Sequence, residues 1–246
     1  MLVHAGQSVR TRHVRGHAGR SFSGFVAMLM FFHALRELPV ATAMTLNYTS
    51  PLFQVLLLAA LAGQRLGAKL VGAVLLGFVG VVLVLRPTIG AEAFWPALLG
   101  LLSGAIGAVA YWNIRELVRA DEPEARVVFY FGVVSLVGSL AWAIVSPDGW
   151  HGPSSHTWWM LLGVGALGAL GQFAMTRAYG QGSTLVAATL SYSGIVFSSV
   201  IGVLWLGDRP PWAAWAGIAL IVVAGILAVH LRPDRRVAAP PQLTND

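Results

Sequence analysis

Polar side chains are scarce inside the long apolar runs of this chain, and the few that occur there are the residues that could bind a solute. Asn47 and Tyr48 lie within one apolar run, and Ser191 and Tyr192 lie within another. An unpaired amide or hydroxyl in hydrocarbon carries a large free-energy cost, so each must find a partner or water. The four residues therefore indicate either the wall of a solute path or hydrogen bonds that tie helices together.

Pro51 lies four residues after Asn47 in the same run. A proline ring has no N–H to donate to the carbonyl four residues earlier, so it releases the Asn47 carbonyl oxygen inside the run. We predict a kink there, and we include Pro51 among the substrate-binding candidates.

Three further polar residues, Gln172, Tyr111 and Asn113, are candidates for the same wall. Tyr111 and its neighbour Trp112 could equally anchor the end of a helix at the membrane interface, where amphipathic rings are enriched.

Two basic residues, His33 and Arg177, lie near the predicted membrane boundary. Side chains of this kind either extend to lipid headgroups, or act as a gate, or bind a substrate carboxylate. All 10 acidic residues fall in loops, tails or the ends of apolar runs, which predicts facilitated transport or exchange rather than a carboxylate proton relay. His33 and Glu116 are the only candidates for coupling to protons.

The sequence offers little to an enzyme or a metal site. It has no Cys, its 7 His residues are scattered, and no HExxH pattern occurs. An intramembrane enzyme would need a buried nucleophile with a base, or clustered metal ligands. We therefore expect no catalytic residues, no metal and no cofactor.

The elements that must position the polar residues are membrane helices. The chain of 246 residues is 57% hydrophobic and 11% charged, which is too little charge to cover a soluble globule. Eight apolar runs each have about the 20 residues that cross the hydrocarbon core of a bilayer. They lie at about 21–38, 40–62, 68–86, 94–114, 127–146, 157–179, 184–206 and 212–231. We predict an all-α polytopic membrane protein with about eight transmembrane helices.

Basic residues indicate the orientation of these helices. If both termini are cytoplasmic, only Arg36, Arg86 and Arg209 of the 16 Lys and Arg residues lie in outer segments. This bias follows the positive-inside rule and predicts a multi-pass protein of a bacterial-type inner membrane with both termini in the cytoplasm. Because the basic residues lie in short loops rather than on one face, we expect the lipid bilayer and no nucleic acid as a partner.

The second and seventh apolar runs repeat each other. Thr45 matches Thr189 and Tyr48 matches Tyr192, and the match continues so that runs one to three correspond to runs six to eight. Chance similarity between apolar helices is the alternative. The copies are an odd number of runs apart, so they would cross the membrane in opposite directions, as in the inverted repeats of secondary transporters. Runs four and five have no partner, so we expect inverted five-helix repeats of which the first is N-terminally incomplete.

Several longer stretches carry a family resemblance. They are residues 35–43 (LRELPVATA), 46–53 (LNYTSPLF), 77–87 (GFVGVVLVLRP), 171–179 (GQFAMTRAY) and 190–193 (LSYS). These stretches resemble the EamA family of the drug/metabolite transporter superfamily. The resemblance implies an inner-membrane carrier of the ten-helix kind with two inverted five-helix repeats, here without the first two helices.

On that resemblance the chain divides into four parts. Residues 1–20 would be a cytoplasmic N-terminal segment, 21–86 a partial first EamA repeat of three helices, 94–231 a second repeat of five helices, and 232–246 a disordered cytoplasmic tail. The implied function is secondary transport of a small organic metabolite, amino-acid-like or similar, by alternating access, as export or exchange. A homodimer is a further partner considered. A non-transporting membrane fragment that associates with other membrane proteins is the alternative, and an intramembrane enzyme is a third reading.

Overall fold

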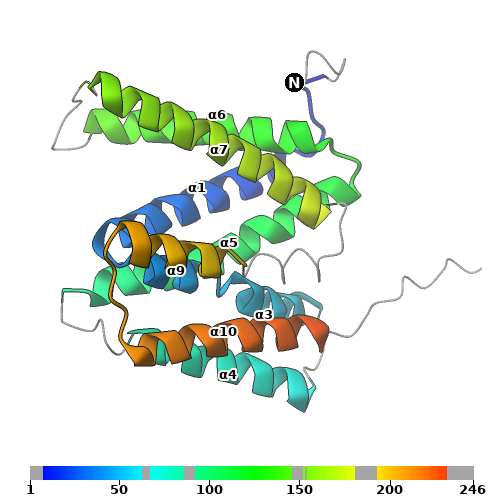
Figure 1. Cartoon of the computed structure of the whole chain (residues 1–246). Coiled ribbons are helices and arrows are strands. Elements are labelled where there is room, and N and C mark those ends of the chain that lie inside the picture. Colours follow the sequence, from blue (N-terminus) through cyan, green and yellow to red (C-terminus); the bar gives the residue numbers. More distant parts are fainter. Residues whose placement is uncertain are drawn as a thin grey trace, which may run out of the picture.

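The protein is built from α-helices throughout the part of the chain that a computed structural model describes, which is residues 8–62, 67–85, 92–145, 152, 154–180 and 193–231. Figure 1 shows the helices as a stack of layers, with α6 and α7 at one side of the bundle and α4 and α10 at the other. The helices are α1 (Val14–Glu37), α2 (Val40–Asn47), α3 (Ser50–Ala62), α4 (Ala68–Leu85), α5 (Phe94–Arg119), α6 (Glu124–Val145), α7 (Ser155–Gly180), α9 (Ser193–Trp205) and α10 (Trp212–His230).

These helices follow the predicted apolar runs. Four of them, α1, α5, α6 and α7, are long and apolar enough to cross a membrane on their own. The second run is shared by α2 and α3, and α9 covers the described part of the seventh. The prediction of an all-α polytopic membrane protein is confirmed. One boundary differs, because α1 begins at Val14 rather than at residue 21 and so draws Arg20 into the helix. The tail at 232–246 lies outside the described residues.

The second run is broken in the middle. Helix α2 ends at Asn47 and α3 begins at Ser50, with Tyr48 and Thr49 between them. The Thr49 hydroxyl donates to the Leu46 carbonyl oxygen at 2.6 Å, which occupies one of the carbonyls at the end of α2. Pro51 falls in the first turn of α3, where a helix needs no backbone N–H. The kink predicted at Pro51 is therefore present as a break between two helices.

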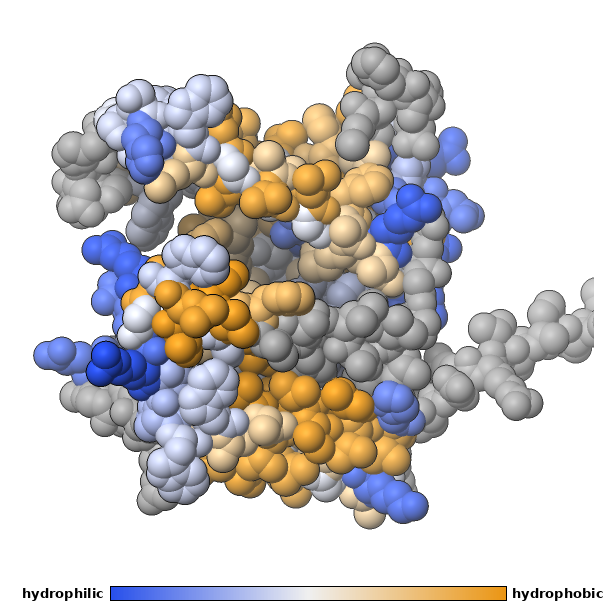
Figure 2. All heavy atoms as spheres, viewed as in Figure 1, coloured by the Kyte–Doolittle hydropathy of each residue, from blue (hydrophilic) through white to orange (hydrophobic). Residues whose placement is uncertain are grey.

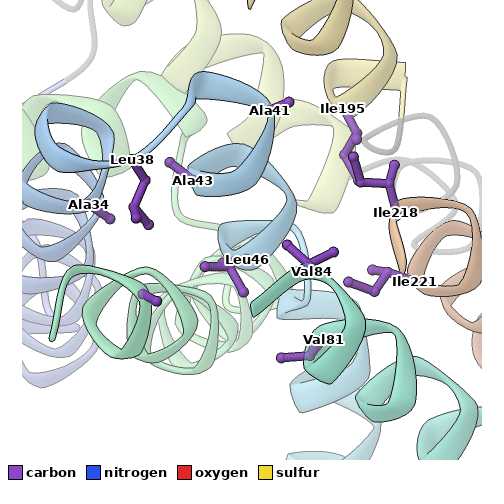
Figure 3. Packing of buried hydrophobic residues seen from close by; sticks show 11 residues of the cluster. Ala34, Leu38, Ala41, Ala43, Leu46, Val81, Val84, Ile195, Ile218 and Ile221 are labelled. Atoms are coloured by element: carbon purple, nitrogen blue, oxygen red, sulfur yellow. The ribbon is translucent and has the colours of Figure 1, made fainter. Parts of the chain in front are cut away.

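Helix α5 lies at the centre of the bundle, where it packs against α1, α2, α3 and α7. The main apolar cluster includes Ala97 of α5 and joins it to α1, α2, α4, α9 and α10. In Figure 3, Leu38, the residue after α1, lies beside Ala43 of α2, and Val84 of α4 lies between Leu46 and Ile221. The short helix α2 is thus enclosed on all sides by other helices.

Helices α4 and α10, the counterparts in the two predicted repeats, lie side by side (Figure 1). Gly77 faces Ala224, while Gly80 faces Gly217, so residue numbers that increase along α4 lie opposite residue numbers that decrease along α10. The two helices are therefore antiparallel, as inverted repeats require. Neither Gly80 nor Gly217 has room for a side chain, because a Cβ on either would lie 2.8 Å or less from the carbonyl oxygen of the other.

The outer surface of the bundle is apolar over several helices. Figure 2 shows hydrophobic side chains covering α4 and α10 on the face in view. On α7, Trp159 and Leu167 are 75% and 71% exposed. Helices with such surfaces require lipid tails as their solvent.

The glycine contact between α4 and α10 gives a test of this packing. In Gly80→Val the new carbons would meet the Gly217 backbone, and overpacking of this kind costs about 1–3 kcal/mol. We expect the thermal unfolding midpoint of the detergent-purified variant to fall. Gly72→Val is the matched control, because a Cβ on Gly72 has no atom within 4 Å. Equal midpoints for the two variants would contradict the contact.

Candidate functional site

A cavity of about 140 Å³ lies between α1, α2, α5, α6 and α7. Its polar lining consists of Arg20, Asn47, Tyr111 and Gln172. The rest of the wall is formed by apolar side chains and glycines: Gly24, Ala27, Met28, Phe31, Gly107, Ala110, Phe131 and Met175. The cavity therefore combines a few hydrogen-bonding groups with an apolar surface, which is the usual composition of a small-molecule site.

Arg20 is the one charged residue among the described residues that line the cavity, and sequence analysis did not select it. Its side chain is only 2% exposed. Its Nη2 donates to Gln172 Oε1 at 2.8 Å, and its guanidinium carbon lies 4.3 Å from the centre of the Phe131 ring. Gly24, one turn further along α1, makes room for the guanidinium, because a Cβ there would collide with Arg20 Nη1.

Asn47 lines the cavity at the end of α2 and also ties α2 to α5. Its Nδ2 donates to Ser103 Oγ at 2.9 Å. The Ser103 hydroxyl in turn donates to the Gly100 carbonyl oxygen at 2.6 Å. The interhelical hydrogen bond that the sequence left open for Asn47 is thus present, and the same side chain lines the cavity, while its place in a solute path stays a prediction.

Two of the other candidates, Gln172 and Tyr111, also lie on the cavity wall. The Tyr111 ring stacks on Tyr179 of α7, with ring centres 4.7 Å apart and an angle of 5° between the planes. Trp112 instead lines a narrow pocket next to it, together with Gln54. A stacked pair such as this fixes the direction of the Tyr111 side chain.

The remaining candidates from the second and seventh apolar runs are not among the described residues that line the cavity. Tyr48 is directed at α9, where a Cβ on Gly194 would lie 2.5 Å from its hydroxyl oxygen. Pro51 is buried at the start of α3. Ser191 and Tyr192 lie outside the described residues.

The other candidates are exposed at the surface or form hydrogen bonds within their own helix. Asn113 donates to its own helix at the Val109 carbonyl oxygen, 3.0 Å away. His33 and Arg177 are exposed, and Glu116 forms an exposed ion pair with Arg119 at 3.2 Å. None of these side chains is among the described residues that line the cavity. Their roles as gate or coupling residues stay predictions.

A second polar cluster, formed around Glu122, lies at the link between α5 and α6. The Glu122 carboxylate accepts hydrogen bonds from Thr11 and from Arg126 Nη1, the latter at 2.6 Å, and His17 Nε2 lies 3.4 Å away. Burial acts to raise the pKa of Glu122, but the hydrogen bonds from Thr11 and Arg126 outweigh it and hold the pKa below its ordinary value. The cluster fastens the residues before α1 to the start of α6.

Comparisons with known proteins agree with this architecture. The EamA-like transporter family matches residues 11–86 and 94–230. A crystal structure of another protein superposes with a TM-score of 0.64 at 25% identity, covering 93% of this chain and 79% of the other.

Three named relatives that are similar to this chain are transporters. The pseudopaline exporter CntI of Pseudomonas aeruginosa is 32% identical over 210 residues, which cover 84% of this chain and 72% of the relative. The riboflavin transporter of Vibrio cholerae is 29% identical over 239 residues, 94% and 77% of the two chains. The S-adenosylmethionine uptake transporter of Rickettsia felis is 23% identical over 230 residues, 94% and 76% of the two chains. All three names describe transport, but they agree neither on a solute nor on a direction.

The lowered pKa of Glu122 gives a pH-dependent prediction. A carboxylate whose pKa is lower when folded contributes stability above its unfolded pKa, about 4.3, and that contribution is lost as the pH falls through the folded pKa. We expect Glu122→Gln to lower the unfolding midpoint at pH 7 and to differ less from wild type in acid. Glu37→Gln, at an exposed position, is the control. A constant difference between Glu122→Gln and wild type at all pH values would refute the role of the charge.

Proposed function

Because the chain belongs to the EamA-like transporter family, we propose that it carries a small organic metabolite by alternating access, as export or exchange, through a bacterial-type inner membrane with both termini in the cytoplasm. The observation that supports this proposal is the cavity between the helices, whose wall combines four polar side chains with apolar ones. Polar side chains that face a cavity between membrane helices indicate a solute path by default.

Both predicted repeats contribute to that cavity. Asn47 comes from α2 of the first repeat, and Arg20 comes from α1, one residue before the predicted start of that repeat at residue 21. Tyr111 and Gln172 come from α5 and α7 of the second. Sites at the interface of inverted repeats can open to either side when one repeat moves against the other. The antiparallel packing of α4 on α10 supports the same reading.

A solute larger than the cavity needs such a movement in order to bind. Its 140 Å³ is less than the roughly 300 Å³ of the smaller ligand pockets. Helices α6 and α7 are the parts that move at least cost, because their buried residues are few: Val127, Phe131, Thr176 and Tyr179. These four residues belong to the first turns of α6 and the last turns of α7, so the pair is attached to the bundle at one end.

The lining also bears on the driving force. No Asp or Glu occurs among the described residues that line the cavity, so a carboxylate that gains and loses a proton beside the solute is not part of the proposal. Facilitated transport or exchange needs only the solute gradient. No enzymatic activity is proposed for the cavity.

Transport in proteoliposomes tests the proposal. Vesicles containing the purified chain are loaded with metabolites extracted from bacterial cells, and the released compounds are quantified by mass spectrometry. We expect faster release of at least one metabolite than from protein-free vesicles. Asn47→Leu should slow that release about tenfold, the effect of losing one hydrogen bond to the solute.

Thr45→Val is the matched control, since it also removes a polar group from α2, one whose hydroxyl donates only to Ala41 of the same helix. Release that does not exceed that of protein-free vesicles for any metabolite would refute the proposed function. Equal rates for Asn47→Leu and Thr45→Val would remove Asn47 from the solute path.

A further inference from the structure

We infer that the cavity selects solutes that carry an anionic group, a carboxylate or a phosphate, and that the Arg20 guanidinium binds this group. The inference rests on the proposed function and specifies its substrate class. It is carried by the burial of Arg20, by its hydrogen-bond partners and by the composition of the cavity wall.

Arg20 is a buried cation without a counter-charge in the described part of the chain. It is 2% exposed and lies on α1 about 8 Å from the middle of the helix, at a rise of 1.5 Å per residue. The ion pairs between the described residues involve His17, Arg36, Arg119 and Arg126 as cations, and none involves Arg20. A buried charge normally has a charged partner or a water-filled cavity next to it, because the cost of desolvation is large.

The partners that Arg20 has are neutral, and they leave part of its hydrogen-bonding capacity unused. Gln172 accepts one bond from Nη2, and Phe131 offers its ring face. The Nε–H has no hydrogen-bond partner among the described residues. A guanidinium presents five N–H donors in a planar fork that matches the two oxygens of a carboxylate or phosphate.

The rest of the wall favours the same solute class. Asn47 and Tyr111 can donate further hydrogen bonds to an anion held at Arg20. No acidic side chain among the described lining residues competes for the guanidinium. Met28 and Phe31 supply apolar surface, which keeps the local dielectric low and strengthens the attraction between the charges. The cavity thus suits an organic anion with an apolar body.

Thermal unfolding of the purified full chain in detergent tests the inference with matched probes. Benzoate and acetate are compared with their neutral amides, benzamide and acetamide, and inorganic phosphate is a further anion. We expect at least one anion to raise the midpoint by about 2–4 °C, as a ligand that binds only the folded state does, and its neutral counterpart to leave it unchanged. Arg20→Gln should abolish the shift, and Arg20→Lys, which keeps the charge but not the fork, should reduce it.

Arg36→Gln is the control for the loss of one positive charge, because Arg36 is exposed. Three results would each overturn the inference: shifts by the carboxylates that their amides match, with none by phosphate; no shift with any of the three anions; or an anion shift that survives Arg20→Gln. If Arg20→Gln does not fold, the comparison of each carboxylate with its amide in wild type still tests whether the cavity prefers anions.

Two further measurements separate the inference from neighbouring explanations. If only micelles containing phosphatidylglycerol stabilise the wild type, the anion is a lipid headgroup and the solute inference is wrong. If soluble anions stabilise the protein through Arg20 but vesicles release no metabolite, the anion site stands and the proposed function fails. If vesicles release only neutral metabolites, at rates that Arg20→Gln does not change, the function stands and the inference fails.

Discussion

The close approach of α5 to the end of α2 is the contact on which the site depends. A Cβ on Gly104 would lie 2.8 Å from the Asn47 carbonyl oxygen, so the two backbones touch. That carbonyl is the one that Pro51 leaves without its usual donor. A broken helix is tolerated inside a membrane only where protein covers the freed backbone, and α5 provides this cover. The same contact brings Asn47 within 2.9 Å of Ser103 and closes one side of the cavity.

Close glycine contacts hold α5 against α2 and α4 against α10, and along α5 they end where the cavity begins. Gly100 and Gly104 hold α5 against α2, and Gly80 and Gly217 hold α4 against α10. A Cβ on Gly107, one turn beyond Gly104, would meet no atom within 4 Å, and this residue lines the cavity. The face of α5 that seals the core therefore becomes the wall of the cavity within a single helical turn. Helix association in lipid relies on such close packing, since the hydrophobic effect does not drive it.

Local signals in the sequence predicted the helices, the break at Pro51 and the position of Asn47, because a proline or an amide inside an apolar run is conspicuous by itself. Arg20 was missed because it continues a run of arginines that the positive-inside rule assigns to the cytoplasm. Its burial comes from Phe131 and Gln172, which are distant in sequence. Gly24, on the same helical face, leaves room for the guanidinium. Tyr48 was expected at the cavity but lies in the link between α2 and α3. The helical periodicity of neither helix therefore determines where its side chain points.

The distribution of charge between the two polar clusters explains why Arg20 is left for a solute. His17 lies one turn before Arg20 on α1 and is the residue that contacts Glu122. The Glu122 carboxylate is already bonded to Thr11 and Arg126, both outside the cavity. A carboxylate that contacted Arg20, one helical turn after His17 on α1, would neutralise the guanidinium and leave the cavity with no preference for charge. Glu122 is instead bonded to Thr11 and Arg126. The positive charge of Arg20 is therefore balanced when an anion enters the cavity, and the free energy of that pairing becomes part of solute binding.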